Sequence, residues 1–291
     1  MDTKTCIVTG ANSGIGFETA LALAGKGARL VMICRNEAKG QEARRQIIES
    51  SGNEAISLYI ADLGKQRDIR RVASEIQNDH PVVDVLVNNA GTWISKRTFT
   101  EDNVETVFAV NHLSYFLLSH ELMPALLKAD EARIVCVGSD SHFQVKGMNW
   151  EDYTLGKKYH GLKSYAQSKL ANCYFVYELH RRLRARGIDH VHTYCIQPGL
   201  VKTDIGLKHT FSLHSIVWKI RRMGGVTPAE GASTSIYLAS SPEASGKSGL
   251  YWDKSKPKKS SGATYDEDAA KRVWDMSLEM VGLEEFSIKT D

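Results

Sequence analysis

The sequence lacks the features of a membrane-spanning or nucleic-acid-binding chain. It contains no apolar run of about 18 residues, the length at which a transmembrane helix becomes a candidate. Its 37 lysines and arginines stand against 34 aspartates and glutamates, and the net charge of +3 is too small to favour a nucleic-acid partner. Apolar residues begin within the first few positions, which predicts that no signal peptide precedes the first strand.

Cysteine is also scarce. The five cysteines, at positions 6, 34, 136, 173 and 195, form an odd set without Cys-x-x-Cys spacing. This predicts reduced thiols in a cytoplasmic chain rather than a disulfide framework. No metal site is predicted either, because His190 and His192 share one face of a predicted strand but have no third ligand nearby.

Apolar runs and helical patterns alternate along the 291 residues. We predict strands at 5–9, 29–34, 56–61, 82–87, 133–137, 190–196 and 248–252, and helices at 17–24, 37–50, 66–79, 101–128, 164–186, 205–223, 228–240 and 266–281. This alternation predicts an α/β fold, a Rossmann-type doubly wound parallel sheet with helices on both faces. No linker or repeat interrupts it, so we expect residues 1–291 to form a single domain.

A glycine-rich turn separates the first predicted strand from the first predicted helix. In such a turn, backbone amides can approach a pyrophosphate at the positive end of a helix. Glycine is required where a Cβ would block that approach or where the backbone φ is positive. The turn has the spacing G-x-x-x-G-x-G, and its candidate binding residues are Gly10, Asn12, Ser13, Gly14, Ile15 and Gly16.

Other candidates follow the next strands, at the sheet edge where ligands of this fold bind. Arg35 follows the second strand, where an arginine can pair with the 2′-phosphate of NADP and an acidic residue would bind the 2′-hydroxyl of NAD. No acidic residue stands there, so NADP(H) is the predicted cofactor. The ends of the third and fourth strands supply Asp62, Leu63, Asn88, Ala90 and Gly91, which are also residues typical of turns.

Tyr165 and Lys169 are four residues apart in a predicted helix, so they lie on one face. A neighbouring cation favours the phenolate, and we therefore expect Lys169 to lower the pKa of Tyr165 and fit it for acid–base chemistry. Ser139 follows the strand 133–137, where it is placed to touch a ligand. Asn111 lies on or beside the apolar stripe of the helix 101–128, so it is either a structural tie or part of a polar site.

These motifs, in this order, resemble the short-chain dehydrogenase/reductase family over the whole chain, and retinol-dehydrogenase-like members most. The matching segments are Thr9 to Gly16, Asp62-Leu63, Asn88 to Gly91, Asn111, Ser139, Tyr165-x-x-x-Lys169 and Pro198-Gly199. The family usually has Ser-Ser where this chain has Gly138-Ser139. Ser139 matches the catalytic serine, and Ser141 is the alternative.

The resemblance implies an oxidoreductase that transfers a hydride between a nicotinamide cofactor and an alcohol or carbonyl group. Tyr165 would exchange the proton, Lys169 would lower its pKa and hold the nicotinamide ribose, Ser139 would bind the substrate oxygen, and Asn111 would hold a water. The cofactor site would add Pro198, Gly199, Val201 and Thr203 to the strand-end and turn residues above. The alternatives are a non-catalytic nucleotide-binding sensor or scaffold of the same fold, and a sugar-nucleotide epimerase or dehydratase.

The segment 205–225 predicts the nature of the substrate. In the family this stretch closes over the substrate as a lid, and here it carries an aliphatic stripe and no carboxylate or amide between Ile205 and Val226. We therefore expect a lipophilic alcohol, aldehyde or ketone; the alternative is that the stripe packs on the core. The same segment, apolar on one side and basic on the other, could rest on a membrane surface. A homodimer through the helices 101–128 and 164–186 is a further expectation from the family.

Overall fold

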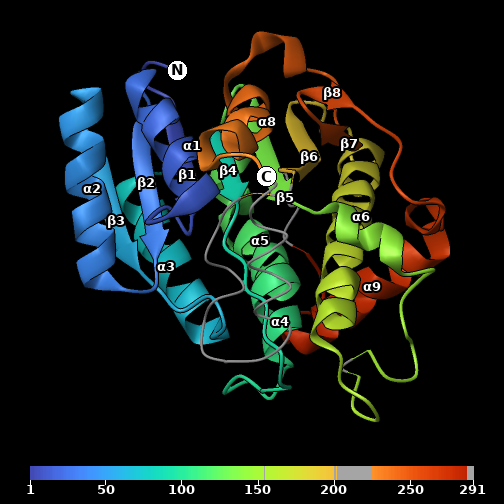
Figure 1. The fold of residues 1–291 in the computed structure, drawn as a ribbon. Coiled ribbons are helices and arrows are strands. Elements are labelled where there is room, and N and C mark those ends of the chain that lie inside the picture. The colour runs from blue at the N-terminus through green and yellow to red at the C-terminus, as the bar shows by residue number, and fades with distance from the viewer. Residues whose placement is uncertain (154, 200, 202–224, 287–291) are drawn as a thin grey trace.

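A computed structural model describes residues 1–153, 155–199, 201 and 225–286. Within these ranges an eight-stranded sheet runs in the order β3-β2-β1-β4-β5-β6-β7-β8 (Figure 1). All neighbours pair in parallel except β7 and β8. The strands are β1 Thr5–Thr9, β2 Arg29–Cys34, β3 Ile56–Ile60, β4 Val85–Asn88, β5 Ala132–Val137, β6 Val191–Gln197, β7 Leu250–Asp253 and β8 Lys256–Pro257.

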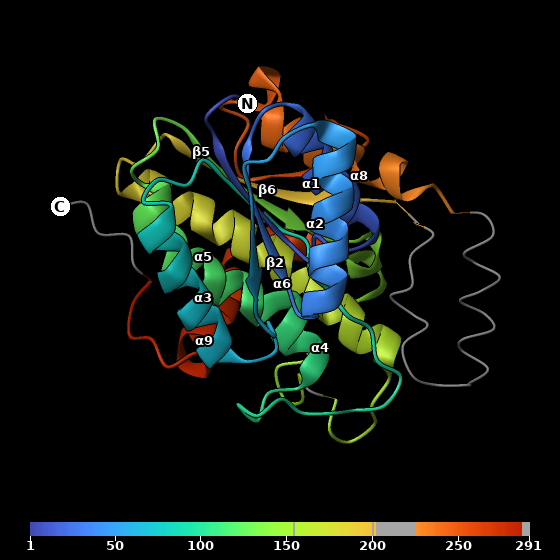
Figure 2. The ribbon, with the colours of Figure 1, turned by 90° about the vertical axis from the view of Figure 1, so that its left-hand side faces the viewer.

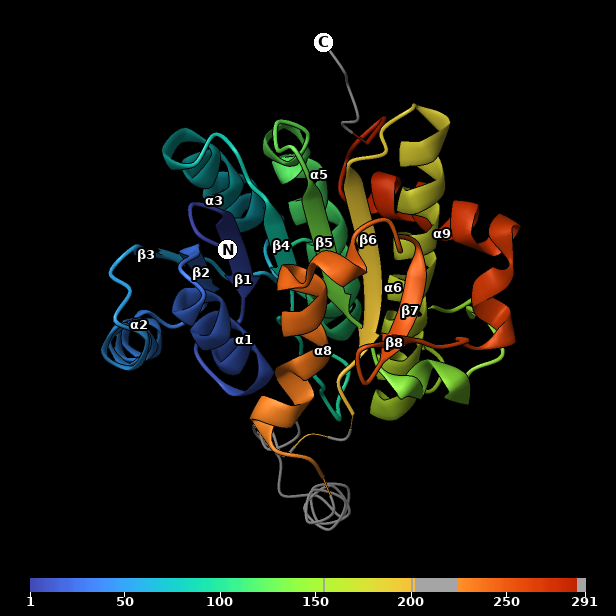
Figure 3. The ribbon, with the colours of Figure 1, turned by 90° about the horizontal axis from the view of Figure 1, so that it is seen from above.

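Helices cover both faces of this sheet. Successive residues of a strand point to opposite faces, so Ile7 belongs to one apolar core while Cys6 and Val8 belong to the other. Figures 2 and 3 show the two layers, with α1 (Gly14–Gly25), α2 (Glu37–Ser51) and α8 (Pro228–Ser240) on one side. The other side carries α3 (Gln66–Asp79), α5 (Ser114–Leu126), α6 (Gly161–Ala185) and α9 (Glu267–Met280). The predicted doubly wound α/β fold is confirmed.

One predicted helix differs clearly from the structure. The helix expected at 101–128 begins only at α4 (Thr106–Phe108), continues as a π-helical segment, Ala109–Leu113, and then as α5. The short antiparallel strand β8 at the sheet edge was not predicted. The predicted lid helix at 205–223 and Thr203 lie outside the described residues. Across the described ranges, no helix is both long and apolar enough to cross a membrane.

Candidate active site

The glycine-rich turn joins β1 to α1 in a conformation that its glycines permit. Gly10 and Gly14 have positive φ angles of 65° and 56°, which side chains other than glycine rarely adopt. A Cβ on Gly16 would lie 2.3 Å from the Gly10 carbonyl oxygen and 2.4 Å from Asn89 Nδ2. Ser13 is the N-cap of α1, but its side chain caps no amide. Amides at this helix end therefore remain open to a phosphate group.

Thr9 and Asn89 fasten this turn to the end of β4. The Thr9 hydroxyl oxygen accepts hydrogen bonds from the backbone amides of Asn89 and Ala90, at 2.8 and 2.9 Å. Asn89 Nδ2 in turn donates to the Thr9 carbonyl oxygen at 2.8 Å. Neither residue was among the predicted site residues, although both stand inside the motifs that identify it. The glycine spacing predicts the turn, but it does not indicate which side chains hold the turn in place.

The remaining strand-end candidates lie along the same edge of the sheet. Arg35 follows β2 with an exposed side chain, and no hydrogen bond or ion pair ties it to another described residue. Asp62 follows β3, and its Oδ1 accepts from the Gly64 amide at 3.0 Å, while Leu63 beside it is buried. Asn88 ends β4 fully buried, with Nδ2 donating to Ser119 Oγ at 3.0 Å. Ala90 and Gly91 follow it, partly buried.

Ser139, Tyr165 and Lys169 come together beyond the end of β5. Ser139 caps the short 3₁₀ helix Asp140–Gln144, with its Oγ accepting from the Ser141 amide at 3.2 Å, and it lies close enough to the Tyr165 phenol to act on the pKa of that group. Lys169 is 2% exposed, and its Nζ donates to the Val137 carbonyl oxygen at 2.7 Å. Its Nζ also lies 5.6 Å from the centre of the Tyr165 ring. The predicted catalytic side chains thus share one site.

Ser141 does not share this contact with Tyr165. Its hydroxyl is buried and has no hydrogen-bond partner among the described residues, and its amide donates to Ser139 Oγ at 3.2 Å. Of the two serines left open by the sequence, Ser139 is therefore the one beside the phenol.

Burial controls the charge of the tyrosine and the lysine. It raises the pKa of Tyr165 to about 12, although the hydrogen bond with Ser139 acts in the opposite direction. It lowers the pKa of Lys169 to about 8, against the influence of three nearby cysteine thiols. The prediction that Lys169 brings the tyrosine pKa below its ordinary value is therefore wrong for these residues by themselves. The ammonium group is turned to the Val137 carbonyl, and burial is the larger effect.

Asn111 lies in the π-helical segment and is fully buried. Its Oδ1 accepts from the Thr92 amide at 2.7 Å, and its Nδ2 donates to the Thr92 carbonyl at 3.0 Å. Nδ2 also donates to Ser168 Oγ at 3.0 Å, one residue before Lys169. The π turn explains this placement, because the wider turn re-aims one side chain and such turns are frequent at functional sites. Asn111 is a structural tie within the polar site.

Gly138 stands where the family usually has the first serine of its Ser-Ser pair. A Cβ at this position would lie 2.8 Å from Cys195 Sγ and 2.9 Å from the Ile196 carbonyl oxygen. The neighbouring strand β6 therefore leaves no room for a side chain here. This contact gives a physical reason for the departure from the family pattern, and it leaves Ser139 unaffected.

The end of β6 closes the site on the other side. Gln197 Oε1 accepts from the Asp140 amide at 2.8 Å, which links β6 to the segment after Ser139. Pro198 follows, and Gly199 has a positive φ of 81°. Val201 forms an isolated bridge with Val226 and packs against Gly231 at the start of α8.

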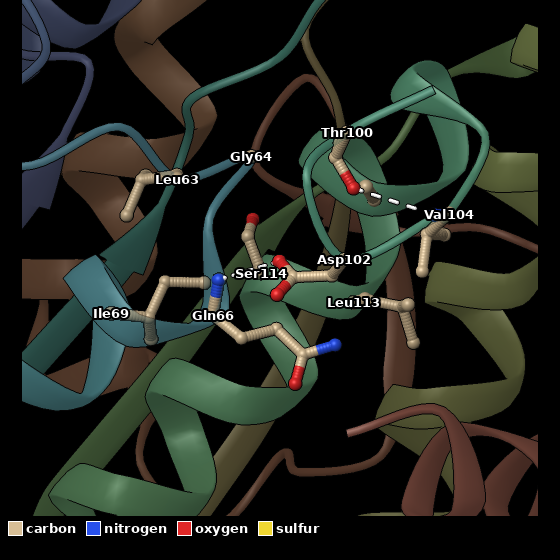
Figure 4. A pocket seen from close by; sticks show the side chains of 10 residues that line it. Leu63, Gly64, Gln66, Ile69, Thr100, Asp102, Val104, Leu113 and Ser114 are labelled. Atoms are coloured by element: carbon tan, nitrogen blue, oxygen red, sulfur yellow. Dashed lines mark hydrogen bonds between the residues drawn. The ribbon is translucent and has the colours of Figure 1, made fainter. Parts of the chain in front are cut away.

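Two cavities lie near the site without forming it. Figure 4 shows one of about 10 Å³ between the start of α3 and the segments 100–104 and 109–114, where Asp102 accepts a hydrogen bond from the Gln66 amide. It has room for one water at most. An open cleft of about 600 Å³ is lined by residues 144–149, Lys163 and Gln167. Within the described ranges, no group of three or more potential metal ligands occurs.

A model of the short chain dehydrogenase family matches residues 4–210. The chain belongs to the short-chain dehydrogenase/reductase family. It is 38% identical to human retinol dehydrogenase 14 over 304 aligned positions, covering 97% of this chain and 88% of the relative. Human polyprenol dehydrogenase is 34% identical, with 96% of this chain and 86% of the relative covered. The similarity to retinol dehydrogenases is thereby confirmed.

Solved structures agree on the architecture. A protein from Mycobacterium paratuberculosis superposes with a TM-score of 0.78 at 29% identity, covering 99% of this chain and 96% of that one. Salutaridine reductase from Papaver somniferum superposes with a TM-score of 0.66 at 22% identity, covering 86% and 99%. The second likeness concerns the fold alone. As a member of this family, the chain is an oxidoreductase that acts on alcohol or carbonyl groups with a nicotinamide cofactor.

Proposed function

We propose that this short-chain dehydrogenase/reductase uses NADP(H) to interconvert a lipophilic alcohol with its aldehyde or ketone, and that Tyr165 is the general acid and base. The observation that carries this proposal is the position of the Tyr165 phenol beside Ser139 and the buried amine of Lys169, whose Nζ lies 5.6 Å from the centre of the tyrosine ring. A sensor or scaffold of the same fold has no need of a serine and a phenol paired in this way.

Tyr165 and Ser139 supply the chemistry at the substrate oxygen. With its pKa raised to about 12 by burial, the phenol carries its proton at neutral pH. It can therefore donate that proton to the oxygen of a carbonyl group as the carbonyl is reduced. The Ser139 hydroxyl beside it can donate a second hydrogen bond to the same oxygen and stabilise the negative charge that develops there.

The residues of the glycine-rich turn fit a dinucleotide. Gly16 lets the turn close against the Gly10 carbonyl and Asn89, which a Cβ would prevent, and the first-turn amides of α1 are not capped by Ser13. These groups would hold the pyrophosphate, and the family assigns the nicotinamide ribose to Lys169. When bound, the cofactor supplies or accepts the hydride. The protein positions it and holds the proton at Tyr165.

Arg35 supports the preference for NADP(H). Its exposed guanidinium follows β2 and makes no ion pair with the described residues, so it is available to a phosphate. Neither Cys34 nor Asn36 beside it is acidic, and Asn36 is occupied in capping the amide of Lys39 at 2.9 Å. An arginine without a competing carboxylate favours the 2′-phosphate over a free hydroxyl.

The class of substrate rests on relatives and on sequence. Relatives of this chain include retinol dehydrogenases and a polyprenol dehydrogenase, whose names denote lipophilic alcohols. The predicted lid at 205–225, which the structure describes only at its last residue, has an aliphatic stripe of matching character. We also propose that the protein is cytoplasmic and that this lid touches membrane surfaces where such substrates partition.

A series of straight-chain aldehydes of increasing length, each with NADPH and with NADH, tests the proposed function. Each methylene that is buried against an apolar surface contributes about 0.8 kcal/mol. Catalytic efficiency should therefore rise from short to medium chains and be higher with NADPH. A flat or falling profile would contradict the lipophilic substrate. Cofactor binding without turnover of any carbonyl or alcohol would favour the sensor or scaffold.

A further inference from the structure

A row of buried polar side chains is hydrogen-bonded to the backbone carbonyl of Asn111. His112 comes from the π-helical segment, Asn172 from α6 and Ser277 from α9. All three are fully buried. None of them belongs to the site of Ser139, Tyr165 and Lys169. The row begins, however, at the backbone of Asn111, which is next to that site.

Hydrogen bonds connect the row from end to end. Asn172 Nδ2 donates to the Asn111 carbonyl oxygen at 2.9 Å. Asn172 Oδ1 lies 3.2 Å from His112 Nδ1, and His112 Nε2 lies 2.9 Å from Ser277 Oγ. The imidazole ring also packs against Phe108, with 5.0 Å between ring centres. Aromatic packing and hydrogen bonds together fix the ring in place.

The chemistry of these groups fixes the direction of the row. A backbone carbonyl only accepts, so Asn172 must turn its NH₂ group to Asn111 and its oxygen to His112. His112 Nδ1 must then carry the proton and donate it to that oxygen. Nε2 of the neutral ring then accepts from the Ser277 hydroxyl, whose other possible acceptor is the Val273 carbonyl oxygen at 2.7 Å. The neutral ring that this requires agrees with burial, which lowers the pKa of His112 to about 4.

Asn111 connects this row to the helical turn of α6 that carries Tyr165. The Asn111 side chain donates to Ser168 Oγ, and Ser168 Oγ donates to the Tyr165 carbonyl oxygen at 2.8 Å. Asn172 thus fixes the backbone of Asn111, and the side chain of Asn111 in turn fixes the helical turn that carries Tyr165. A shift of Asn111 would be passed to that turn.

We propose that His112 is a positioning residue, whose Nδ1–H group fixes Asn172 and thereby the Asn111 carbonyl and the turn of Tyr165. This inference rests on the proposed function, since Tyr165 is the group whose position matters. It predicts that the proton on Nδ1 is what catalysis requires, and that the contact of Nε2 with α9 is dispensable.

Two amide substitutions separate these contacts. In His112→Asn the side-chain NH₂ group can take the place of Nδ1–H, whereas His112→Gln reaches the region of Nε2 and loses the donor to Asn172. Misplacing a catalytic group by a fraction of an ångström can lower kcat by about ten-fold or more. We expect that loss in His112→Gln, with KM for the cofactor unchanged within about two-fold, and recovery of most of the activity in His112→Asn.

Two further variants keep the test decisive if His112→Gln folds poorly. Asn172→Leu removes the donor to Asn111 without changing the histidine, and it should lose kcat by a similar factor. Ser277→Ala removes the partner of Nε2 and the contact of that hydroxyl with the Val273 carbonyl oxygen, but it leaves Nδ1 and Asn172 unchanged, and it should keep kcat within about three-fold. Cofactor affinity and the thermal midpoint are measured for each variant, so that unfolding is not mistaken for lost positioning.

The outcomes distinguish this inference from the proposed function. If the unmodified protein binds the cofactor but converts no carbonyl or alcohol, the proposed function fails. If the unmodified protein is active but His112→Asn and His112→Gln lose kcat equally, the positioning role of Nδ1–H is refuted. An equal loss in Ser277→Ala would refute it as well, because that variant keeps the donor.

Discussion

At the scale of single residues, Arg35 is the residue to which we assign the proposed preference for NADP(H). A charge-assisted hydrogen bond contributes about 1.5–3 kcal/mol, or roughly one to two decades of affinity. Arg35→Asp should therefore erode or reverse the preference for NADP(H), because the carboxylate repels a phosphate and can bind a free 2′-hydroxyl. Catalytic efficiency with each cofactor measures the effect. The exposed Lys26→Asp, at the far end of α1, is the charge-matched control and should leave the preference unchanged.

Lys169 should be a residue that costs stability. Its pKa is lowered from 10.5 to about 8 by burial, so between these pH values the unfolded chain binds more protons than the folded one. Stability from this group therefore rises as the pH rises from 8 to 10.5, and the full penalty applies below pH 8. Lys169→Met removes the buried charge and should raise the free energy of unfolding at pH 7 by about 1–3 kcal/mol, while it removes activity.

Denaturant unfolding at pH 7 and at pH 10 measures this effect. The difference between Lys169→Met and the unmodified protein should shrink at pH 10. Lys163→Met, an exposed lysine on the same helix, should show neither the gain nor the change with pH. A Lys169→Met protein that is less stable at both pH values would mean that the bond to Val137 outweighs the burial of charge.

Single residues also mark the limit of prediction from sequence. The position of Ser139 after a strand and the four-residue spacing of Tyr165 and Lys169 were enough to predict that these side chains lie close together. The pKa of Tyr165 was not predictable, because helical spacing places a lysine nearby but does not reveal that its amine turns to Val137 or that burial dominates. The reason for Gly138 was equally hidden, since Cys195 is 57 residues away along the chain.

At the scale of elements, the turn from β1 to α1 is the proposed site of the cofactor pyrophosphate. Gly16→Ala would place a Cβ against the Gly10 carbonyl and Asn89 Nδ2, so the turn would have to open and affinity for the cofactor should fall by about ten-fold or more. Gly25→Ala, at the other end of α1, meets nothing within 4 Å. It should keep the affinity and add up to about 1 kcal/mol of stability. Fluorescence titration with NADPH compares the two, and equal affinity would contradict the close approach.

Elements with a strong pattern were predicted well. The predicted helices 66–79 and 228–240 coincide with α3 and α8, and the strand 29–34 with β2. The π-helical segment was missed because its apolar residues continue the same helical pattern on both sides. One wider turn leaves no periodic signal in so short a stretch, although the buried Asn111 was a hint of it.

For the whole molecule, the alternation of strands and helices determined the fold because parallel strands need crossover helices. The packing of the C-terminal region could not be predicted from this alternation. Phe286, 2% exposed, packs against Phe116 of α5 and Trp274 of α9, with ring centres 5.3 and 4.8 Å apart. Phe286 also lies 6.5 Å from Phe175 of α6, measured between ring centres, so it packs on both helices through which a homodimer is expected from the family. The homodimer stays a prediction.

Replacing the Tyr165 hydroxyl tests the proposed chemistry most directly. Tyr165→Phe removes only the proton donor, so turnover should fall by about 10²–10⁴-fold while cofactor affinity and the thermal midpoint stay close to those of the unmodified protein. Tyr174 lies on the same helix as Tyr165, and its hydroxyl donates a hydrogen bond to the Ala263 carbonyl oxygen. Tyr174→Phe is therefore the matched control and should stay active. If Tyr165→Phe kept more than a few per cent of the turnover, the proton would have to come from another group, and the role assigned to Tyr165 would be wrong.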